Sequence, residues 1–320
     1  MYSIEGRVVM KAAQIKAYGG KEVMQVTDDA PKPALEDEQV LVEVAAAGVN
    51  PFDITVREGH ARQMAELDFP ATLGGDVAGT VAEIGGKVQV FQVGHAVYGQ
   101  AKALSGHGSF AEFTPVPITQ LAAKPAKLDF TQAAAVPLVA ASAYQALVDH
   151  MNLQKGQRIL IHGAAGGIGS LAVQLAKHLG AYVAATASAE EVDFVKSLGA
   201  DEVIDYKNQD FSQLIKDYDA VFDTVGGDTN TRSYTVLKSG GTLVSMLAQP
   251  DDELVKKYRI NYVAQSSRVT IERLTKVAEL FDAGVLKPKV DKVFPLDQAA
   301  EALEYLKTGH PHGKVVIQVK

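Results

Sequence analysis

The chain has no cysteine among its 320 residues. Disulfide bonds, thiolate metal sites and a cysteine nucleophile are therefore excluded. Basic residues are not in excess either, because 31 Lys and Arg stand against 38 Asp and Glu, which gives a formal net charge of −7. The two signs are interspersed and no basic stripe is present, so the composition argues against nucleic acid or an anionic membrane as a partner.

Long hydrophobic runs are also missing. No apolar stretch reaches the roughly 18 residues that a membrane-spanning helix needs, and no secretory signal is recognisable, so we expect a cytoplasmic protein. The length predicts two domains, each with its own core. Residues 1–9 include Ile4-Glu5-Gly6-Arg7, which matches a protease site used in expression vectors, so we interpret them as an added leader or tag remnant.

A glycine-rich turn is the most informative motif. It lies between a predicted strand at residues 158–162 and a predicted helix at residues 170–179, and a second apolar run follows at residues 182–187. The glycines are Gly163, Gly166, Gly167 and Gly169, a variant of the GxGxxG pattern. Such a turn lets a pyrophosphate approach backbone N–H groups at the positive end of the helix, so we predict a dinucleotide site. The alternative is that these glycines only permit close packing.

Further strands and helices alternate up to residue 265. They predict an α/β fold in which six parallel strands form a doubly wound sheet. In such sheets the ligand lies at the carboxyl ends of the strands, which indicates the cofactor-binding residues. These are predicted to be Ala165, Gly166, Gly167, Ile168, Gly169, Thr186, Ser188, Tyr206, Val225, Gly226, Met246, Leu247 and Ala248.

The end of the second strand predicts which cofactor is bound. It reads Thr186-Ala187-Ser188, without the acid that usually accepts from the ribose 2′-hydroxyl of NAD. A small hydroxyl residue tolerates a 2′-phosphate, so we predict NADPH, with Tyr206 lining the adenosine phosphate pocket. This prediction requires that Glu190 and Glu191 point away from the site.

The region from residue 11 to 127 differs in pattern. Short strand-like runs with Gly and Pro turns predict a β-rich domain, and helices from residue 130 join it to the nucleotide-binding domain. A final strand near residues 314–319 is expected to return to the first domain, which would make that domain discontinuous.

The chain resembles the zinc-free quinone oxidoreductase branch of the medium-chain dehydrogenase/reductase superfamily, the zeta-crystallin-like branch. The resemblance rests on AAAGVNPFDITVREG (45–59), LGGDVAGTVAEIG (73–85), AAAVPLVAASAYQAL (133–147), GQRILIHGAAGGIGSLAVQLAK (156–177), DAVFDTVGG (219–227) and the stretch from residue 290 to 317. It implies a GroES-like domain at residues 10–128 and 269–320 and a Rossmann domain at residues 129–268. It also implies a homodimer that delivers hydride from NADPH to a quinone or to an α,β-unsaturated carbonyl, a small-molecule substrate.

Two departures from the zinc-dependent relatives concern metal binding. Gly74-Gly75-Asp76 stands where those enzymes have Gly-His-Glu, and Asn50 stands where they have the first cysteine ligand. With no thiolates and scattered histidines, we expect no metal site.

The same resemblance points to Asn50 and Asp53 as catalytic residues. The Asn50 amide can donate a hydrogen bond to the oxygen on which charge develops, or to the cofactor, and Asn50 is therefore also a predicted cofactor-binding residue. Alternatively Asn50 shapes the turn before Pro51, and Asp53 holds a loop or Arg57. The proton donor is left open between His107, Tyr144 and water. Two rival functions also stay open: reduction of another activated alkene, such as an enoyl thioester or a haloacrylate, and a non-catalytic NADPH-binding role.

Overall fold

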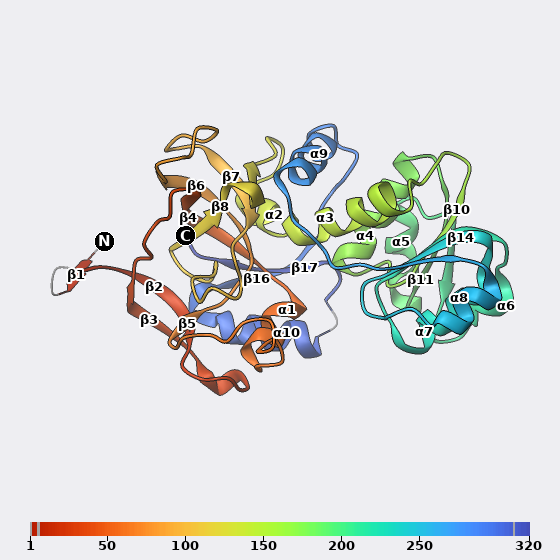
Figure 1. Ribbon diagram of the computed structural model, residues 1–320, viewed down its shortest axis with the longest axis horizontal. Helices are drawn as coiled ribbons and strands as arrows, with labels where there is room; N and C mark the ends of the chain where they lie inside the picture. The colour runs from red at the N-terminus through yellow and green to blue at the C-terminus, as the bar shows by residue number, and fades with distance from the viewer. Residues whose placement is uncertain (1, 5–6, 310) are drawn as a thin grey trace. The chain divides into compact units, whose positions relative to one another are not determined.

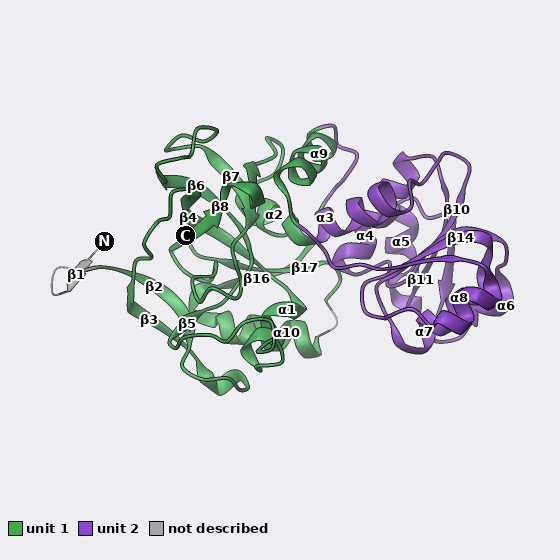
Figure 2. Cartoon of the chain, viewed as in Figure 1, with its two compact units in different colours: residues 1–138, 269–282, 288–320 green, residues 139–268, 283–287 purple. Residues whose placement is uncertain are grey.

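The computed structural model describes residues 2–4, 7–309 and 311–320. The chain divides into two compact units (Figure 2). Unit 1 comprises Met1–Leu138, Val269–Asp282 and Pro288–Lys320, and unit 2 comprises Val139–Arg268 and Ala283–Lys287. The first junction lies later than the boundary predicted after residue 128, because helix α2 (Phe130–Ala134) packs against strands β4 and β6 of unit 1.

Unit 1 contains two sheets. The larger has the strand order β16-β17-β4-β6-β7-β9, with β8 also paired to β4, and the smaller has the order β1-β2-β3, with β5 paired to β2. The strands are β1 (Tyr2–Ile4), β2 (Arg7–Ile15), β3 (Met24–Pro31), β4 (Gln39–Val49), β5 (Ala71–Thr72), β6 (Asp76–Ile84), β7 (Ala96–Gln100), β8 (Phe113–Pro117), β9 (Leu121–Ala123), β16 (Val290–Pro295) and β17 (Lys314–Gln318). The α-helices are α1 (Pro51–Arg57), α2, α9 (Ile271–Asp282) and α10 (Ala299–Thr308).

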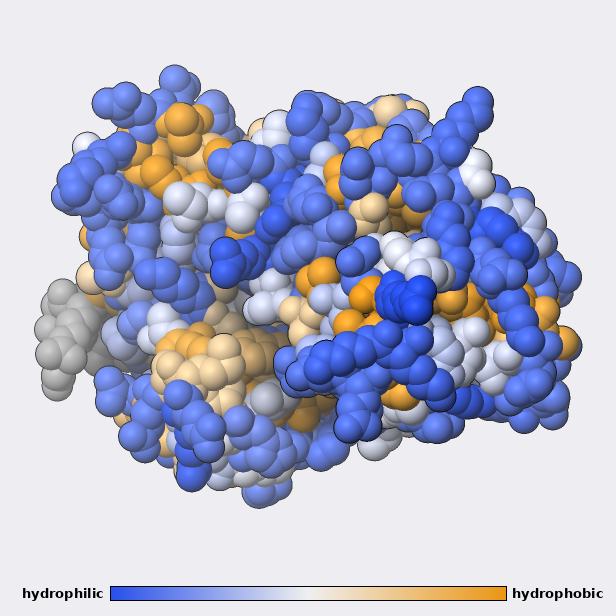
Figure 3. Space-filling view, turned by 45° about the vertical axis from the view of Figure 1, so that its right-hand side comes forward, coloured by the Kyte–Doolittle hydropathy of each residue, from blue (hydrophilic) through white to orange (hydrophobic). Residues whose placement is uncertain are grey.

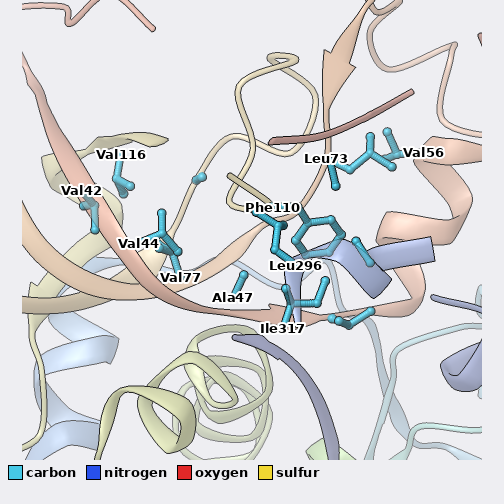
Figure 4. Close-up of a cluster of buried hydrophobic side chains, with 14 of the residues drawn as sticks. Val42, Val44, Ala47, Val56, Leu73, Val77, Phe110, Val116, Leu296 and Ile317 are labelled. Atoms are coloured by element: carbon cyan, nitrogen blue, oxygen red, sulfur yellow. The ribbon is translucent and has the colours of Figure 1, made fainter. Parts of the chain in front are cut away.

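Strand β4 is central to unit 1. Nearly all of its eleven residues are buried, as its apolar sequence predicts, and it pairs with β17, β6 and β8. Gly79 of β6 permits this close pairing, because a Cβ there would lie 2.1 Å from the carbonyl oxygen of Glu43. The labelled core side chains, among them Val44 and Phe110, gather beside this strand (Figure 4). The final strand β17 joins the same sheet, so unit 1 is built from discontinuous segments of the chain.

The N-terminal residues extend the smaller sheet. Strand β2 begins at Arg7, inside the range interpreted as a leader, and Val9 is buried and paired with Pro31. Strand β1 pairs with β2 in antiparallel fashion. Residues 1, 5 and 6 of the interpreted leader lie outside the described residues, and the origin of this segment stays a prediction.

Unit 2 contains a parallel sheet with the order β12-β11-β10-β13-β14-β15. Its strands are β10 (Arg158–Ile161), β11 (Tyr182–Ala187), β12 (Glu202–Asp205), β13 (Tyr218–Asp223), β14 (Leu237–Ser245) and β15 (Asn261–Ala264). The helices are α3 (Pro137–Tyr144), which continues as a π-helix (Gln145–His150), α4 (Gly167–His178), α5 (Val192–Ser197), α6 (Phe211–Leu214), α7 (Gly227–Ser233) and α8 (Asp252–Tyr258).

The strand order confirms the predicted doubly wound topology. The chain starts at β10 and moves outward to β11 and β12, then returns to β13 and moves outward the other way. Strands β10, β11 and β14 of this sheet are labelled in Figure 1. Because parallel crossovers are right-handed, the helices of the two halves cover opposite faces of the sheet. A crevice for a ligand is expected beside β10, where the strand order reverses. No helix among the described residues is long and apolar enough to cross a membrane.

Candidate active site

The glycine-rich turn connects β10 to α4 in unit 2. Gly163 adopts a φ of +65°, a conformation that favours glycine, and Gly166 is the N-cap of α4 without a side chain that could cap the helix. In the part of the chain that the structure describes, no side chain caps this helix, so its first N–H groups are available to an anion at the positive end of the helix dipole.

The glycines of this turn do different things. A Cβ at Gly169 would lie 2.2 Å from the Gly163 carbonyl oxygen, so this glycine lets helix and turn pack closely. A Cβ at Gly166 would lie 3.4 Å from that same oxygen, which is an ordinary contact distance. Gly166, Gly167 and Ile168 are half-buried, whereas Ala165 and Gly169 are buried. Packing and phosphate binding are thus both compatible with the motif, at separate glycines.

Thr186 lies near the end of β11 and faces the interior of unit 2. Its Oγ1 lies 3.0 Å from Nδ1 of His162, whose Nε2 lies 2.9 Å from Oγ of Ser233. Burial lowers the pKa of His162 to about 4, which keeps the imidazole neutral near pH 7. The Thr186 hydroxyl therefore serves an internal hydrogen-bond chain, and Ser188 is the nearer candidate for a cofactor contact.

Ser188, directly after β11, is hydrogen-bonded to a carboxylate. Its N–H and its hydroxyl both donate to Oε2 of Glu191, at 2.9 and 2.8 Å. The expectation that both acids point away is wrong for Glu191, because the residue folds back to cap the following helical turn. Tyr206 lies beside the same strand end, where its N–H donates to the Ala187 carbonyl at 3.2 Å and its side chain is 55% exposed.

A buried carboxylate that sequence reasoning missed shapes the loops after β13 and β14. Oδ1 of Asp223 accepts from the N–H groups of Val225 and Gly226, both at 2.9 Å, and Oδ2 accepts from the Ser245 hydroxyl at 2.9 Å. The sequence signal is an acid at the end of a buried strand, followed three residues later by the pair Gly226-Gly227.

Ser245 extends this order into the next loop, because its Oγ accepts from the N–H groups of Leu247 and Ala248 at 3.3 and 3.1 Å. The side chains of Val225 and Leu247 are 49% and 69% exposed, while Met246 and Ala248 are half-buried. Exposed apolar side chains form separate patches on a mainly hydrophilic surface (Figure 3). Those at the carboxyl edge of this sheet fit the apolar lining of a ligand site.

Asn50 lies in unit 1, directly after β4, and is the N-cap of α1. Its backbone N–H donates to Oδ2 of Asp53 at 2.8 Å. Asp53 therefore holds the start of the helix, in agreement with one of the two structural alternatives. The other is wrong, because Arg57 pairs with Glu304 at 2.8 Å and with Glu58 at 3.1 Å.

The Asn50 side chain lies between two buried charged groups. Its Nδ2 donates to Oδ2 of Asp76 at 2.9 Å, and its Oδ1 accepts from Nζ of Lys314 at 2.5 Å. These residues lie at one end of β4, β6 and β17, which are neighbours in the sheet. Sequence reasoning missed Lys314, because its position becomes meaningful only once β17 pairs with β4.

Burial governs the ionisation of this cluster. It raises the pKa of Asp53 to about 7, with a smaller contribution from the negative charge of Asp76. It also raises the pKa of Asp76, which Lys314 and the hydrogen bond from Asn50 oppose. For Lys314 burial lowers the pKa, and the two carboxylates act in the opposite direction.

Among the residues that the structure describes, no group of three or more His, Cys, Asp or Glu side chains is arranged to hold a metal ion. Asp76 accepts hydrogen bonds from the N–H of Leu138, at 3.1 Å, and from the side chain of Asn50.

Comparison with known proteins identifies relatives that cover nearly the whole chain. Residues 36–126 match the alcohol dehydrogenase GroES-like domain, and residues 198–317 match a family described as zinc-binding dehydrogenase. An NADPH-dependent alkenal/one oxidoreductase from the chloroplast of Arabidopsis thaliana is 38% identical over 96% of this chain and 79% of its own.

Solved structures agree with this. The quinone oxidoreductase from Coxiella burnetii is 34% identical, with a TM-score of 0.90 over 98% of this chain and all of its own. The Escherichia coli quinone oxidoreductase in complex with NADPH is 27% identical, with a TM-score of 0.86 over 97% of this chain and 100% of its own. The chain belongs to the medium-chain dehydrogenase/reductase family, in its quinone oxidoreductase and alkenal reductase branch.

Proposed function

We propose that the protein is an NADPH-dependent reductase of quinones or α,β-unsaturated carbonyls. Membership of the family makes it an NAD(P)H oxidoreductase of the quinone and enone reductase type. The observation that carries the assignment of a cofactor site is the uncapped N-terminus of α4 behind a glycine turn that leaves room at Gly166.

The residues present fit a nicotinamide dinucleotide. The N–H groups of Gly167, Ile168 and Gly169 would meet the pyrophosphate, with Ala165 and Gly166 forming the turn beneath it. Tyr206 and Ser188 would line the adenosine end, and the loops that Asp223 and Ser245 order would line the remainder. When bound, the cofactor supplies a hydride.

The choice of NADPH over NADH is the finer part of the proposal. It is supported by the NADPH-dependent relative from Arabidopsis and by the E. coli relative in complex with NADPH. The exposed Tyr206 beside β11 offers a surface for the adenosine phosphate. Glu191 acts against it, since its carboxylate occupies both donors of Ser188.

We assign the Asn50 amide as a hydrogen-bond donor to the substrate oxygen. Hydride addition to a quinone or to the β-carbon of an enone leaves negative charge on an oxygen, and a preorganised N–H donor stabilises that charge. Asp53 is assigned to hold Asn50 through the backbone. This assignment replaces catalysis by Asp53 with a positioning role, because its oxygen is engaged by the Asn50 N–H.

The proposal is tested by the consumption of NADPH with a panel of quinones, enones, an enoyl thioester and a haloacrylate. We expect turnover with quinones or enones, and a loss of about 100-fold in kcat for Asn50→Ala. Asn261→Ala is the matched control, because Asn261 is an exposed asparagine that bonds only the Gly240 carbonyl among the contacts described. Turnover restricted to thioesters or haloacrylates would show that the substrate is another activated alkene and not a quinone or enone. NADPH binding without any turnover would support a non-catalytic protein.

A further inference from the structure

Lys314 is a buried cation that the proposed reaction does not yet use. Its side chain is almost completely buried at the start of β17, and its Nζ donates to the Val49 carbonyl at 2.7 Å and to Asn50 Oδ1 at 2.5 Å. Burial of an ammonium group is costly unless hydrogen bonds and opposite charge compensate it. Asp76 provides that charge, with Oδ2 at 4.0 Å from Nζ.

The chemistry of these two partners fixes the orientation of the Asn50 carboxamide. A protonated lysine offers only donors, and an ionised aspartate offers only acceptors. The Oδ1 atom of Asn50 must therefore face Lys314, and Nδ2 must face Asp76. A rotation of the amide by 180° would place two donors together on one side and two acceptors on the other, so the flipped state is disfavoured.

The same arrangement polarises the amide. A positive charge at the carbonyl oxygen and a negative charge at one N–H both draw electron density from nitrogen toward oxygen, which makes the nitrogen a stronger donor. The Nδ2 atom has two N–H groups and Asp76 takes one. The other N–H makes no hydrogen bond within residues 2–4, 7–309 and 311–320, so the protein itself leaves this donor unused.

We propose that Lys314 and Asp76 are positioning residues that orient and polarise Asn50, so that its second N–H becomes a strong donor to the substrate oxygen. The inference rests on the assignment of Asn50 in the proposed function. It goes beyond that assignment, because it explains how residues of two strands, β6 and β17, prepare the amide that follows β4 for the reaction. The two oxygen acceptors of Nζ and the Asp76 carboxylate at 4.0 Å support a charged lysine, and they oppose burial, which lowers the pKa of Lys314.

The first experiment replaces Lys314 and measures turnover. We expect Lys314→Met to lower kcat by about tenfold or more, while the Kd for NADPH stays within about twofold. Lys314→Arg keeps the cation and should restore part of the loss. In the Asn50→Ala background, Lys314→Met should cause little further loss, because a residue that acts through Asn50 has nothing left to position.

The second experiment observes the amide itself without turnover. In protein labelled with ¹⁵N only at asparagine, the side-chain signals of Asn50 are assigned by their loss in Asn50→Ala. We expect Lys314→Met and Asp76→Asn each to shift these signals, and the signals of Asn208, which belongs to unit 2 and bonds Asp205, to stay in place. Asp76→Asn has nearly the size of the parent residue, so it provides the test even where Lys314→Met does not fold.

The outcomes separate the two proposals. Full activity of Asn50→Ala would overturn the assignment of Asn50. Unshifted Asn50 signals in both variants would overturn the positioning role of Lys314 and Asp76, even in an active enzyme. An equal loss on Lys314→Met with and without Asn50 would also overturn it, because Lys314 would then act independently of the amide.

Discussion

The two units build polar sites in opposite ways. In unit 2 the turn from Gly163 to Gly169 offers backbone N–H groups on contiguous residues and uses no charged side chain. In unit 1 the amide of Asn50 lies between Lys314 and Asp76, which come from distant parts of the chain. The first site depends on whether backbone can be approached closely, and the second depends on whether buried charges are balanced.

This difference predicts how each site fails. Backbone donors bring no net charge into the protein, so the turn is damaged mainly by added volume. A buried ion pair is damaged mainly by loss of one partner, because the remaining charge is left without compensation. Substitutions that change volume alone or charge alone therefore distinguish the two units.

The largest effect is expected from Gly169→Val. Its Cβ would lie 2.2 Å from the Gly163 carbonyl oxygen and 2.7 Å from the Ala164 Cα, and neither backbone atom can move aside cheaply. We expect the free energy of unfolding of unit 2 to fall by at least ~3 kcal/mol. Chemical denaturation without cofactor measures it.

Gly166→Ala is the matched variant in the same turn. Gly166 has φ −73° and ψ 175°, which alanine adopts readily, so stability should change by less than ~1 kcal/mol. The methyl group stands where the phosphate is proposed to approach, so the affinity for NADPH should fall about tenfold. Normal binding by this variant would remove the turn as the phosphate site, and a stable Gly169→Val protein would contradict the packing role.

The same contrast explains what could be predicted from the sequence. The glycine turn, the strand at Tyr182–Ala187 and the doubly wound class of the six-stranded sheet depend on contiguous residues and on a general rule of handedness, so local patterns were sufficient. The start of α4 was predicted three residues late, because Gly167 has a low intrinsic helix propensity and the uncapped turn that holds it is not visible in the pattern.

Nonlocal contacts account for what was not predicted. Lys314 is 264 residues from Asn50, and its role depends on the pairing of β17 with β4. Glu191 is close to Ser188 in sequence. The direction of its carboxylate nevertheless depends on the rotamer of its side chain, which the sequence does not specify. Asp53 was predicted by resemblance, whereas its engagement by the Asn50 N–H follows only from the geometry.

Charge balance in unit 1 predicts a pH dependence of intermediate size. The ordinary pKa of Asp53 is 3.8, and burial raises it to about 7 in the folded protein. Between these values the folded state binds more protons than the unfolded state, so the contribution of Asp53 to stability is fully present below pH ~4 and is lost as the pH rises to ~7.

Asp53→Asn removes this titration and keeps an oxygen that can accept from the Asn50 N–H. Relative to the parent, the variant should therefore gain stability between pH ~4 and ~7, on the order of 1–3 kcal/mol, and the gain should level off above that range. Denaturation of both proteins across this range measures the difference, with Asp76 and Lys314, which face Asp53, unchanged in both. A difference that does not vary with pH would show that Asp53 titrates normally.

The smallest effect is expected from a change at Glu191, a charged side chain of unit 2 that lies beside the proposed cofactor site. Glu191 accepts from the N–H and hydroxyl of Ser188, at the strand end proposed to receive the 2′-phosphate. Glu191→Gln keeps an acceptor for Ser188 and removes the negative charge. We expect the affinity for NADPH relative to NADH to rise about fivefold, ~1 kcal/mol, because a partly exposed carboxylate repels the phosphate only through solvent-screened charge.

Glu190→Gln is the control, since it removes the same charge from the exposed neighbouring residue and should change the ratio less. The gain from Glu191→Gln should also shrink as salt is raised from 50 mM to about 500 mM, because the Debye length falls below the distance over which exposed charges interact. Both affinities are measured by the quenching of tyrosine fluorescence. A gain that persists at high salt would indicate a changed hydrogen bond at Ser188. An unchanged ratio would show that Glu191 serves only as a cap and that the 2′-phosphate lies elsewhere, nearer Tyr206.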